Sequence, residues 1–345
     1  MTPGSDPSPA TRLMDSRQPV ILAVEHLSVA VDSPDGPLGL IDDVSFDIRQ
    51  GETLGLVGES GSGKTVTSLA VIGLLPRNVR TVGGAVRVGD TDLVGMPERA
   101  MRRVRGRDIA MVFQEPLSSL NPAFTIGNQI AEMVRAHEPV SRRGARARAV
   151  EMLDLAGIPQ PQKRFHDYPH TFSGGMRQRA MIAMALTCHP KLLIADEPTT
   201  ALDVTIQAQI LELLRSLQRE FGTAMLFVTH DLGVVADICD RVCVMYAGQV
   251  VEQSNVETLF AQPCHPYTDG LLRSVPQGAS STSRLATIPG VVPPADQMPA
   301  GCRFAPRCDF AVAACSAAAP QLESSASGGL ARCCRQHELH LRGAQ

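Results

Sequence analysis

Residues 58–65 read Gly-Glu-Ser-Gly-Ser-Gly-Lys-Thr, the most informative segment of the chain. It fits the phosphate-loop pattern G-x-x-x-x-G-K-[ST], in which backbone N–H groups close around phosphates while the lysine and the final hydroxyl reach the phosphates and Mg²⁺. An apolar strand is expected at residues 53–57 and an apolar helix at residues 64–75, a context that an isolated glycine-rich turn would lack. The stretch therefore predicts a nucleotide site made by these residues: Gly58, Ser60, Gly61, Ser62, Gly63, Lys64 and Thr65.

The composition is that of a folded chain with room for two domains, or for one large domain and an appendage. Of its 345 residues, 44% are hydrophobic, and the formal net charge of −3 argues against binding nucleic acid by bulk attraction. No apolar run approaches the roughly 20 residues that span a bilayer. Residues 1–19 lack the apolar core of a signal peptide and are expected to form a disordered leader. We expect a soluble, cytoplasmic chain.

The order of apolar segments predicts an α/β fold. Alternating side chains at residues 21–31 and 41–48 indicate an antiparallel hairpin. Later strands separated by helices indicate parallel βαβ units, and a helical block at residues 126–157 indicates a subdomain inserted into that sheet. The later strands are expected at residues 108–113, 192–195, 224–229 and 241–246, and the helices at 176–186 and 205–221.

Two acids end one of these strands. Residues 192–197 read Leu-Leu-Ile-Ala-Asp-Glu, so that Asp196 and Glu197 are expected at the carboxyl edge of the sheet, where open α/β sheets bind ligands. Such a strand end is common by itself, but here it accompanies a phosphate loop. We therefore expect Asp196 to contribute to a Mg²⁺ shell and Glu197 to polarise the attacking water.

Residues 172–179, Phe-Ser-Gly-Gly-Met-Arg-Gln-Arg, resemble the signature motif of ATP-binding cassette (ABC) ATPases, with Met176 in place of the usual Gln. Gln114 resembles the Q-loop of that family, His230 its switch histidine, and the Asp203 segment its D-loop. All pieces follow the order of the family, and the resemblance covers roughly residues 20–260.

The resemblance implies a P-loop ABC ATPase with a RecA-like core, an N-terminal antiparallel β subdomain and an inserted helical subdomain at about residues 115–175. It divides the chain into a leader (1–19), a nucleotide-binding domain (20–262) and a C-terminal extension (263–345). It also implies a head-to-tail dimer that sandwiches ATP between the phosphate loop of one subunit and the signature of the other.

The resemblance also assigns roles within this sandwich. A Ser-Gly-Gly segment before a helix is physically an anion site, although alone it would indicate only a helix N-cap. Catalytic roles are implied for Glu197, His230 and Gln114, Mg²⁺ contacts for Thr65, Gln114 and Asp196, and nucleotide contacts across the dimer for Ser173, Gly174, Gly175 and Asp203. Members of the family usually stack adenine on an aromatic ring near the end of the first strand. No aromatic occurs at residues 27–31, so we expect Val31 to provide an apolar contact instead.

Two further stretches resemble the ATPase subunits of oligopeptide and dipeptide importers: residues 113–122, Phe-Gln-Glu-Pro-Leu-Ser-Ser-Leu-Asn-Pro, and residues 263–268, Pro-Cys-His-Pro-Tyr-Thr. The implied function is that of an ATP-hydrolysing motor subunit for peptide uptake, peripheral to the cytoplasmic face of the membrane. The implied partners are two integral membrane permeases, a second, non-identical ATPase subunit and an extracytoplasmic substrate-binding protein, without nucleic acid. Nickel or other small-solute importers of the subfamily remain an alternative, and so does a soluble, non-transport ABC ATPase.

Five cysteines crowd into the tail at Cys302, Cys308, Cys315, Cys333 and Cys334. Cytosolic thiols stay reduced, so such a cluster indicates a metal or redox centre rather than disulfides. The spacing matches neither zinc fingers nor ferredoxins and leaves the metal open. The resemblance implies a 4Fe–4S cluster, with Zn²⁺ as the alternative, on Cys302, Cys308, Cys315 and Cys333, with Cys334 as the alternative for the last ligand. Unligated thiols are the remaining interpretation.

Overall fold

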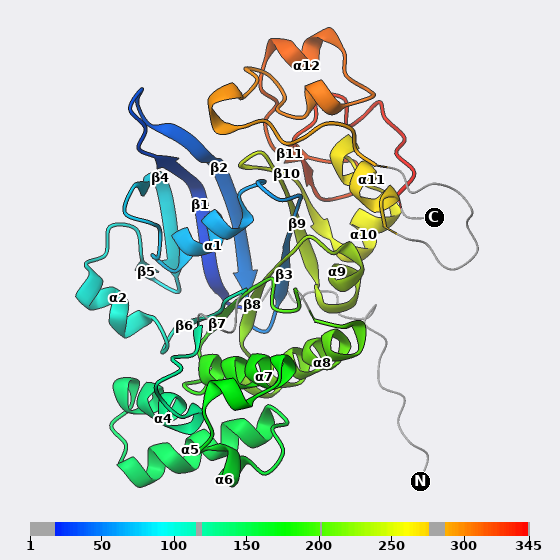
Figure 1. The fold of residues 1–345 in the computed structure, drawn as a ribbon. Helices are drawn as coiled ribbons and strands as arrows, with labels where there is room; N and C mark the ends of the chain where they lie inside the picture. Colours follow the sequence, from blue (N-terminus) through cyan, green and yellow to red (C-terminus); the bar gives the residue numbers. More distant parts are fainter. Residues whose placement is uncertain (1–17, 115–118, 201, 276–286, 344–345) are drawn as a thin grey trace, which may run out of the picture.

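The computed structural model describes residues 18–114, 119–200, 202–275 and 287–343. Two sheets organise this part of the chain (Figure 1), one with the strand order β2-β1-β4-β5 and one with the order β11-β12-β10-β9-β3-β8-β7-β6. The predicted α/β fold is confirmed. The strands are β1 (Val20–Val31), β2 (Leu38–Arg49), β3 (Thr53–Val57), β4 (Val79–Val88), β5 (Thr91–Asp92), β6 (Ile109–Val112), β7 (Leu192–Asp196), β8 (Ala224–Thr229), β9 (Arg241–Tyr246), β10 (Gln249–Asn255), β11 (Glu323–Ser324) and β12 (Leu330–Ala331).

The helices of the described residues fill the chain between these strands. The long helical stretch predicted at residues 126–157 is divided into two helices, and the helix after the signature begins at Gly174 rather than at residue 176. The helices are α1 (Lys64–Val71), α2 (Glu98–Val104), α4 (Ile126–His137), α5 (Arg142–Leu155), α6 (Pro161–Arg164), α7 (Gly174–Leu186), α8 (Val204–Phe221), α9 (Leu232–Ile238), α10 (Val256–Ala261), α11 (Pro266–Arg273) and α12 (Ala313–Ala317), with short 3₁₀ turns at η2 (Pro169–Thr171), η3 (Ala295–Gln297) and η4 (Ala305–Arg307).

The smaller sheet is antiparallel. β1 and β2 form the predicted hairpin, with the buried Val24 opposite the buried Phe46. β4 pairs with the other edge of β1 and was not predicted, because Gly83 and Gly84 resemble a turn signal. Instead they lie at a register shift in the β1–β4 pairing, where a Cβ on Gly84 would approach the His26 carbonyl oxygen to 2.4 Å. The glycines therefore let two strands approach closely at a bulge.

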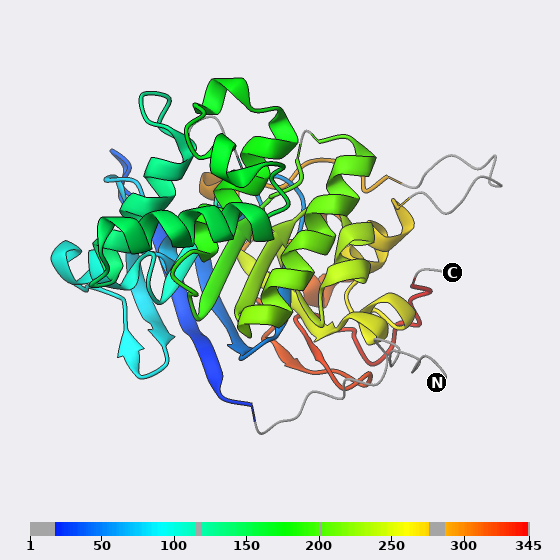
Figure 2. The ribbon, with the colours of Figure 1, turned by 90° about the horizontal axis from the view of Figure 1, so that it is seen from below.

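The larger sheet positions the site. Strands β9, β3, β8, β7 and β6 are mutually parallel, so that their carboxyl ends lie along one edge. Every residue of β3, β7 and β8 is buried, as expected for a sheet covered on both faces. Helices α7 and α8, in green, lie over one face (Figure 2) and share a hydrophobic core with these strands.

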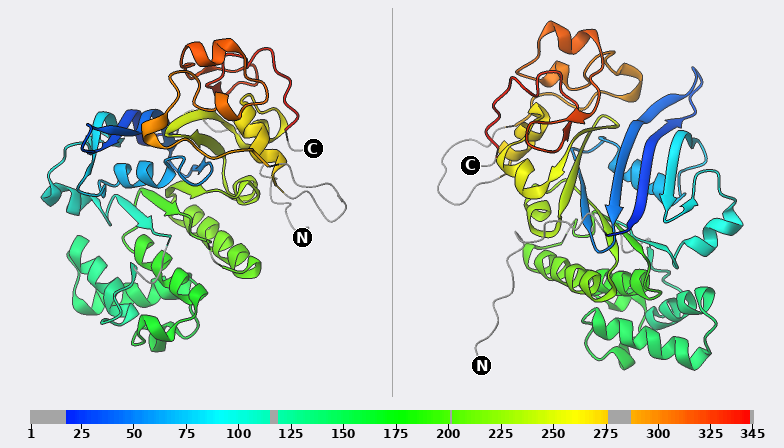
Figure 3. Two further views of the ribbon diagram at one scale, coloured as in Figure 1. Left: turned by 45° about the horizontal axis from the view of Figure 1, so that its top comes forward. Right: turned by 180° about the vertical axis from the view of Figure 1, so that it is seen from behind.

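The helical block and the C-terminal extension lie at opposite ends of the molecule (Figures 1 and 3). Helices α4, α5 and α6 follow β6; α4 and α5 pack beside α7, and α6 packs against α5. β12 pairs with β10 and β11 pairs with β12, so the extension continues the large sheet instead of standing apart from it. Phe304 of the extension is buried in the same core as Tyr246 of β9 and Tyr267 of α11.

Candidate nucleotide site

The phosphate loop connects β3 to α1, as predicted. Lys64 is only 6% exposed, and its Nζ donates hydrogen bonds to the carbonyl oxygens of Gly58 at 2.7 Å and Glu59 at 3.0 Å. Gly58 has a φ of 155°, and a Cβ there would lie 2.2 Å from the Met245 carbonyl oxygen. Only glycine fits this close approach, so the turn depends on it. Burial lowers the pKa of Lys64, against the opposing charges of Glu197, Asp196 and Glu59.

Asp196 ends β7 beside this loop. Its side chain is buried, and among the described residues its Oδ1 has no hydrogen-bond partner. Burial, and then the charge of Glu197, raise the pKa of Asp196 to about 6, while a hydrogen bond with Thr65 and the charge of Lys64 oppose the shift. An unpartnered buried carboxylate oxygen next to a hydroxyl fits Mg²⁺, which prefers oxygen ligands.

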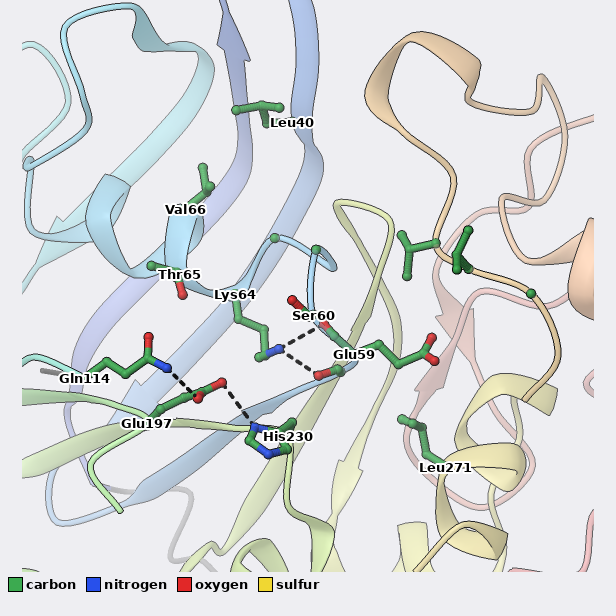
Figure 4. Close-up of a pocket in the computed structure, with 16 residues that line it drawn as sticks. Leu40, Glu59, Ser60, Lys64, Thr65, Val66, Gln114, Glu197, His230 and Leu271 are labelled. Atoms are coloured by element: carbon green, nitrogen blue, oxygen red, sulfur yellow. Dashed lines mark hydrogen bonds and ion pairs between the residues drawn. The ribbon is translucent and has the colours of Figure 1, made fainter. Parts of the chain in front are cut away.

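Glu197 contacts two other predicted site residues, Gln114 and His230 (Figure 4). Its Oε2 accepts a hydrogen bond from Gln114 Nε2 at 3.0 Å, and its Oε1 lies 3.2 Å from His230 Nδ1. Thr200, which was not predicted, donates a further hydrogen bond from Oγ1 to Glu197 Oε2 at 2.9 Å. The backbone of Glu197 has a φ of 45°, in the left-handed region that a non-glycine residue occupies at a cost. The carboxylate is therefore held at the sheet edge by side chains from three different strand ends.

The pocket around these groups also includes residues that the sequence did not predict. Leu40 of β2 lines it, whereas Val31, which pairs with Leu38 and Val79 at the end of β1, is not among the lining residues. The other side is formed far along the chain, by Leu271 and by Gly290, Val291 and Val292. The importer resemblance included Leu271, but the place of these residues in the pocket was not predicted, because they lie more than 200 positions after the phosphate loop.

The signature segment lies outside this pocket. Ser173 caps α7, and its Oγ accepts a hydrogen bond from the Met176 N–H at 3.3 Å. A Cβ on Gly174 would meet open space. Asp203 caps α8 by accepting from the Ile206 N–H at 3.0 Å. Ala201 and residues 115–118, which carry parts of the D-loop and importer resemblances, lie outside the described residues.

The five clustered cysteines line one small cavity together with Phe304 and Phe310. The sulfur of Cys334 lies 3.5 Å from the sulfur of Cys315. Burial raises the pKa of Cys333 to about 12. In the described part of the chain, no group of three or more His, Cys, Asp or Glu side chains is arranged to hold a metal ion. The thiol donors suit a metal, but their present arrangement is not that of a formed site.

Outside that cavity, Cys243 is fully buried in β9 and Cys239 packs at the end of α9, so both act as small hydrophobic residues. Among the helices of the described residues, none is both long enough and apolar enough to cross a membrane.

The chain is 54% identical over 336 residues to a putative peptide import ATP-binding protein of Brucella abortus (strain 2308), an alignment that covers 94% of this chain and 99% of that protein. It belongs to the ABC transporter family. Residues 41–200 match the family described as ABC transporter, and residues 251–315 match that described as oligopeptide/dipeptide transporter, C-terminal region. The oligopeptide transport ATP-binding protein OppD of Salmonella typhimurium is 50% identical over 314 residues, covering 91% of this chain and 93% of OppD.

Solved structures agree with this family. A dimeric ATP-binding cassette with bound ADP and phosphate superposes with a TM-score of 0.61 at 25% identity, covering 68% of this chain and 98% of that cassette. A component of the cbiONQ transporter from Clostridium perfringens gives a TM-score of 0.60 at 27% identity, covering 70% of this chain and 91% of its own. The predictions of an ABC ATPase that binds and hydrolyses ATP are thereby confirmed.

Proposed function

We propose that this ABC ATPase is the motor subunit of an importer that takes up di- and oligopeptides. The observation that carries the proposal is the combination of an ATP site with a C-terminal region of the oligopeptide/dipeptide type in one chain. Relatives that align with more than 90% of this chain bear names that refer to peptide import or oligopeptide transport. The ATPase domain alone would support transport without indicating the solute.

Each residue at the loop edge has a proposed task. The glycines and Lys64 bind the triphosphate, the Glu197 carboxylate accepts a proton from the attacking water, and His230 orients the terminal phosphate. Through the hydrogen bond from Gln114 to Glu197, a change in the conformation of the Q-loop would move the catalytic carboxylate. Thr65, Gln114 and Asp196 would hold Mg²⁺, which neutralises phosphate charge when bound.

The signature forms the other half of the site in a partner subunit. Ser173, Gly174 and Gly175 present the amino end of the 13-residue helix α7, whose exposed N–H groups favour an anion. They do not line the phosphate-loop pocket of their own chain, which favours a role across a dimer. Asp203 belongs to the same proposed dimer face. We propose a head-to-tail pair with a second, non-identical ATPase subunit.

The remaining proposed partners are two membrane permeases and an extracytoplasmic substrate-binding protein, with the ATPase peripheral at the cytoplasmic face. Closing the dimer on ATP would change the permeases from one access state to the other. A shift in such an equilibrium from 1:99 to 99:1 requires about 5.5 kcal/mol of differential binding. Two nucleotides, each contacted by both subunits, can supply that difference.

Uptake of labelled di- and oligopeptides tests this function. A strain that lacks the chain is expected to lose uptake, and the wild-type chain is expected to restore it, whereas a Glu197→Gln chain is not. Labelled nickel measured in the same strains provides the comparison. Loss of nickel uptake with normal peptide uptake would assign the motor to a different solute.

We also propose that the clustered thiols bind a metal centre, an iron–sulfur cluster in preference to Zn²⁺. The support is the donor chemistry, since thiolates suit both, and the shared cavity that all five cysteines line. Metals bind thiolates, so binding requires the thiols to lose their protons, against the raised pKa that burial gives Cys302, Cys308 and Cys333. Binding also requires the sulfurs to move closer together than they lie now. Given its contact with Cys315, we propose Cys334 alongside Cys333 for the last ligand.

Elemental analysis of anaerobically purified protein tests the metal centre. The wild-type chain is expected to carry iron, or zinc if the alternative holds, and the Cys302→Ser/Cys308→Ser variant to lose it. Cys188→Ser is the matched control, because Cys188 lies outside the cavity beside the Met133 carbonyl. Wild-type protein with neither metal would remove the proposal.

A further inference from the structure

One arginine of the C-terminal extension reaches the phosphate loop. Arg307 ends η4 and immediately precedes Cys308. Its Nη1 donates to Glu59 Oε2 at 2.7 Å and its Nη2 to Glu59 Oε1 at 3.1 Å, across 248 positions of sequence. The guanidinium and the carboxylate therefore form a two-bond, fork-to-fork ion pair, which is the strongest geometry for these groups.

The residues of the extension shield the arginine of this pair from solvent. The Arg307 side chain is 5% exposed and that of Glu59 is 32% exposed. The guanidinium carbon lies 5.6 Å from the centre of the Tyr246 ring and 6.0 Å from that of Phe304. A lysine could supply the charge here, but not the planar fork packed between rings.

The extension fixes the backbone of Glu59 as well. The Glu59 N–H donates a hydrogen bond to the Tyr267 hydroxyl at 2.8 Å, and the Glu59 carbonyl accepts one from Lys64. The Glu59 side chain consequently points away from Lys64 and toward the extension (Figure 4). Arg307 also donates to the carbonyl of Pro289, which immediately precedes the pocket-lining residues at 290–292.

The negative charge of Glu59 opposes nucleotide binding, because the loop binds a triphosphate and an unpaired carboxylate would repel it. The charge of Glu59 acts on the phosphate-binding lysine: burial lowers the pKa of Lys64, and Glu59 is among the acids whose charge raises it. Neutralising the Glu59 charge should therefore increase the affinity of the loop for the nucleotide.

We propose that Arg307 is a positioning residue of the nucleotide site, which neutralises the Glu59 carboxylate and holds it away from the phosphates, so that the C-terminal extension completes the phosphate loop. The proposal rests on the proposed binding of ATP to this loop. It predicts that substitution of Arg307 weakens ATP binding only when Glu59 carries its charge.

The competing explanation is that Arg307 only holds the extension against the rest of the protein. A second arginine of the extension distinguishes these two explanations. Arg332, directly before Cys333, donates to Asp43 at 3.3 Å and to the Val250 carbonyl at 3.0 Å. Its side chain is also 5% exposed, but it anchors the extension to β2 and β10 without contacting the phosphate loop. Arg332→Met is therefore the matched control for Arg307→Met.

The experiment is a double-mutant cycle on the purified full chain, with the dissociation constant of Mg²⁺–ATP measured by calorimetry. Arg307→Met is expected to raise the Kd about tenfold, which corresponds to about 1.4 kcal/mol. In a Glu59→Gln background the same substitution is expected to change the Kd by less than about twofold, because no charge remains to be neutralised. High salt should shrink the loss in the single variant, since it screens the repulsion. In the assembled transporter, KM for ATP should rise while kcat stays within about twofold.

The outcomes are distinguishable. A tenfold loss in both backgrounds, or an equal loss in Arg332→Met, would overturn the proposal in favour of docking, and thermal melts of each variant show whether it folds. A wild-type chain with no affinity for ATP would instead overturn the nucleotide site itself.

Discussion

Replacing Glu197 by Gln is expected to preserve ATP binding while slowing ATP hydrolysis about a hundredfold or more, the range attributed to a positioned general base. The amide keeps the shape of the carboxylate, and its oxygen can still accept one of the hydrogen bonds now made by Gln114, Thr200 and His230. It cannot take a proton from water. Single-turnover hydrolysis in the assembled transporter, with ATP binding measured in parallel, tests this result.

A matched control is Glu220→Gln, which makes the same chemical change on the exposed face of α8, away from the pocket. It should hydrolyse ATP at the wild-type rate. Turnover of Glu197→Gln within a few-fold of wild type would remove this carboxylate from its proposed role and leave the water to another group.

Replacing Lys64 by Met is expected to weaken ATP binding about 10- to 150-fold. A hydrogen bond to a charged group contributes about 1.5–3 kcal/mol, and each 1.4 kcal/mol is tenfold in Kd. Methionine has a similar length, but it loses the two hydrogen bonds that tie Nζ to the loop carbonyls of Gly58 and Glu59, along with the charge offered to the phosphates. Calorimetric titration of the purified chain with Mg²⁺–ATP measures the change.

The chain offers a simple control for this variant, because it contains only three lysines. Lys163 is exposed on α6, in the helical block, and Lys163→Met should bind ATP as the wild type does. Equal affinity in Lys64→Met and the wild type would show that the lysine does not contact bound phosphate.

Much of the candidate site could be predicted because it follows strand ends. Lys64, Glu197 and His230 each come shortly after a buried strand, and parallel strands present their carboxyl ends at one edge. An apolar run and the polar residue that follows it are both local in sequence. The convergence of these side chains, with Gln114 after β6, therefore follows from short segments alone.

Other features could not be predicted, for different reasons. β4 contains a pair of glycines that indicates a turn unless the approach of β1 is known. Val31 was the expected apolar contact for adenine, but Leu40 of the neighbouring strand β2 lines the pocket and Val31 is not among the lining residues. In a strand, a shift of register moves a side chain to another place on the sheet, and the alternation of residues does not fix the partner.

The class of fold and the chemistry of the ATP site could therefore be predicted from short segments, because a phosphate loop needs particular residues at fixed local spacing. The position of the C-terminal extension against that loop follows from the folded structure alone. The contact between Arg307 and Glu59 depends on how β10, β12 and the aromatic core of Tyr246, Tyr267 and Phe304 pack together. Long-range contacts of this kind arise from the shape of the folded chain, and no periodicity or motif encodes them locally.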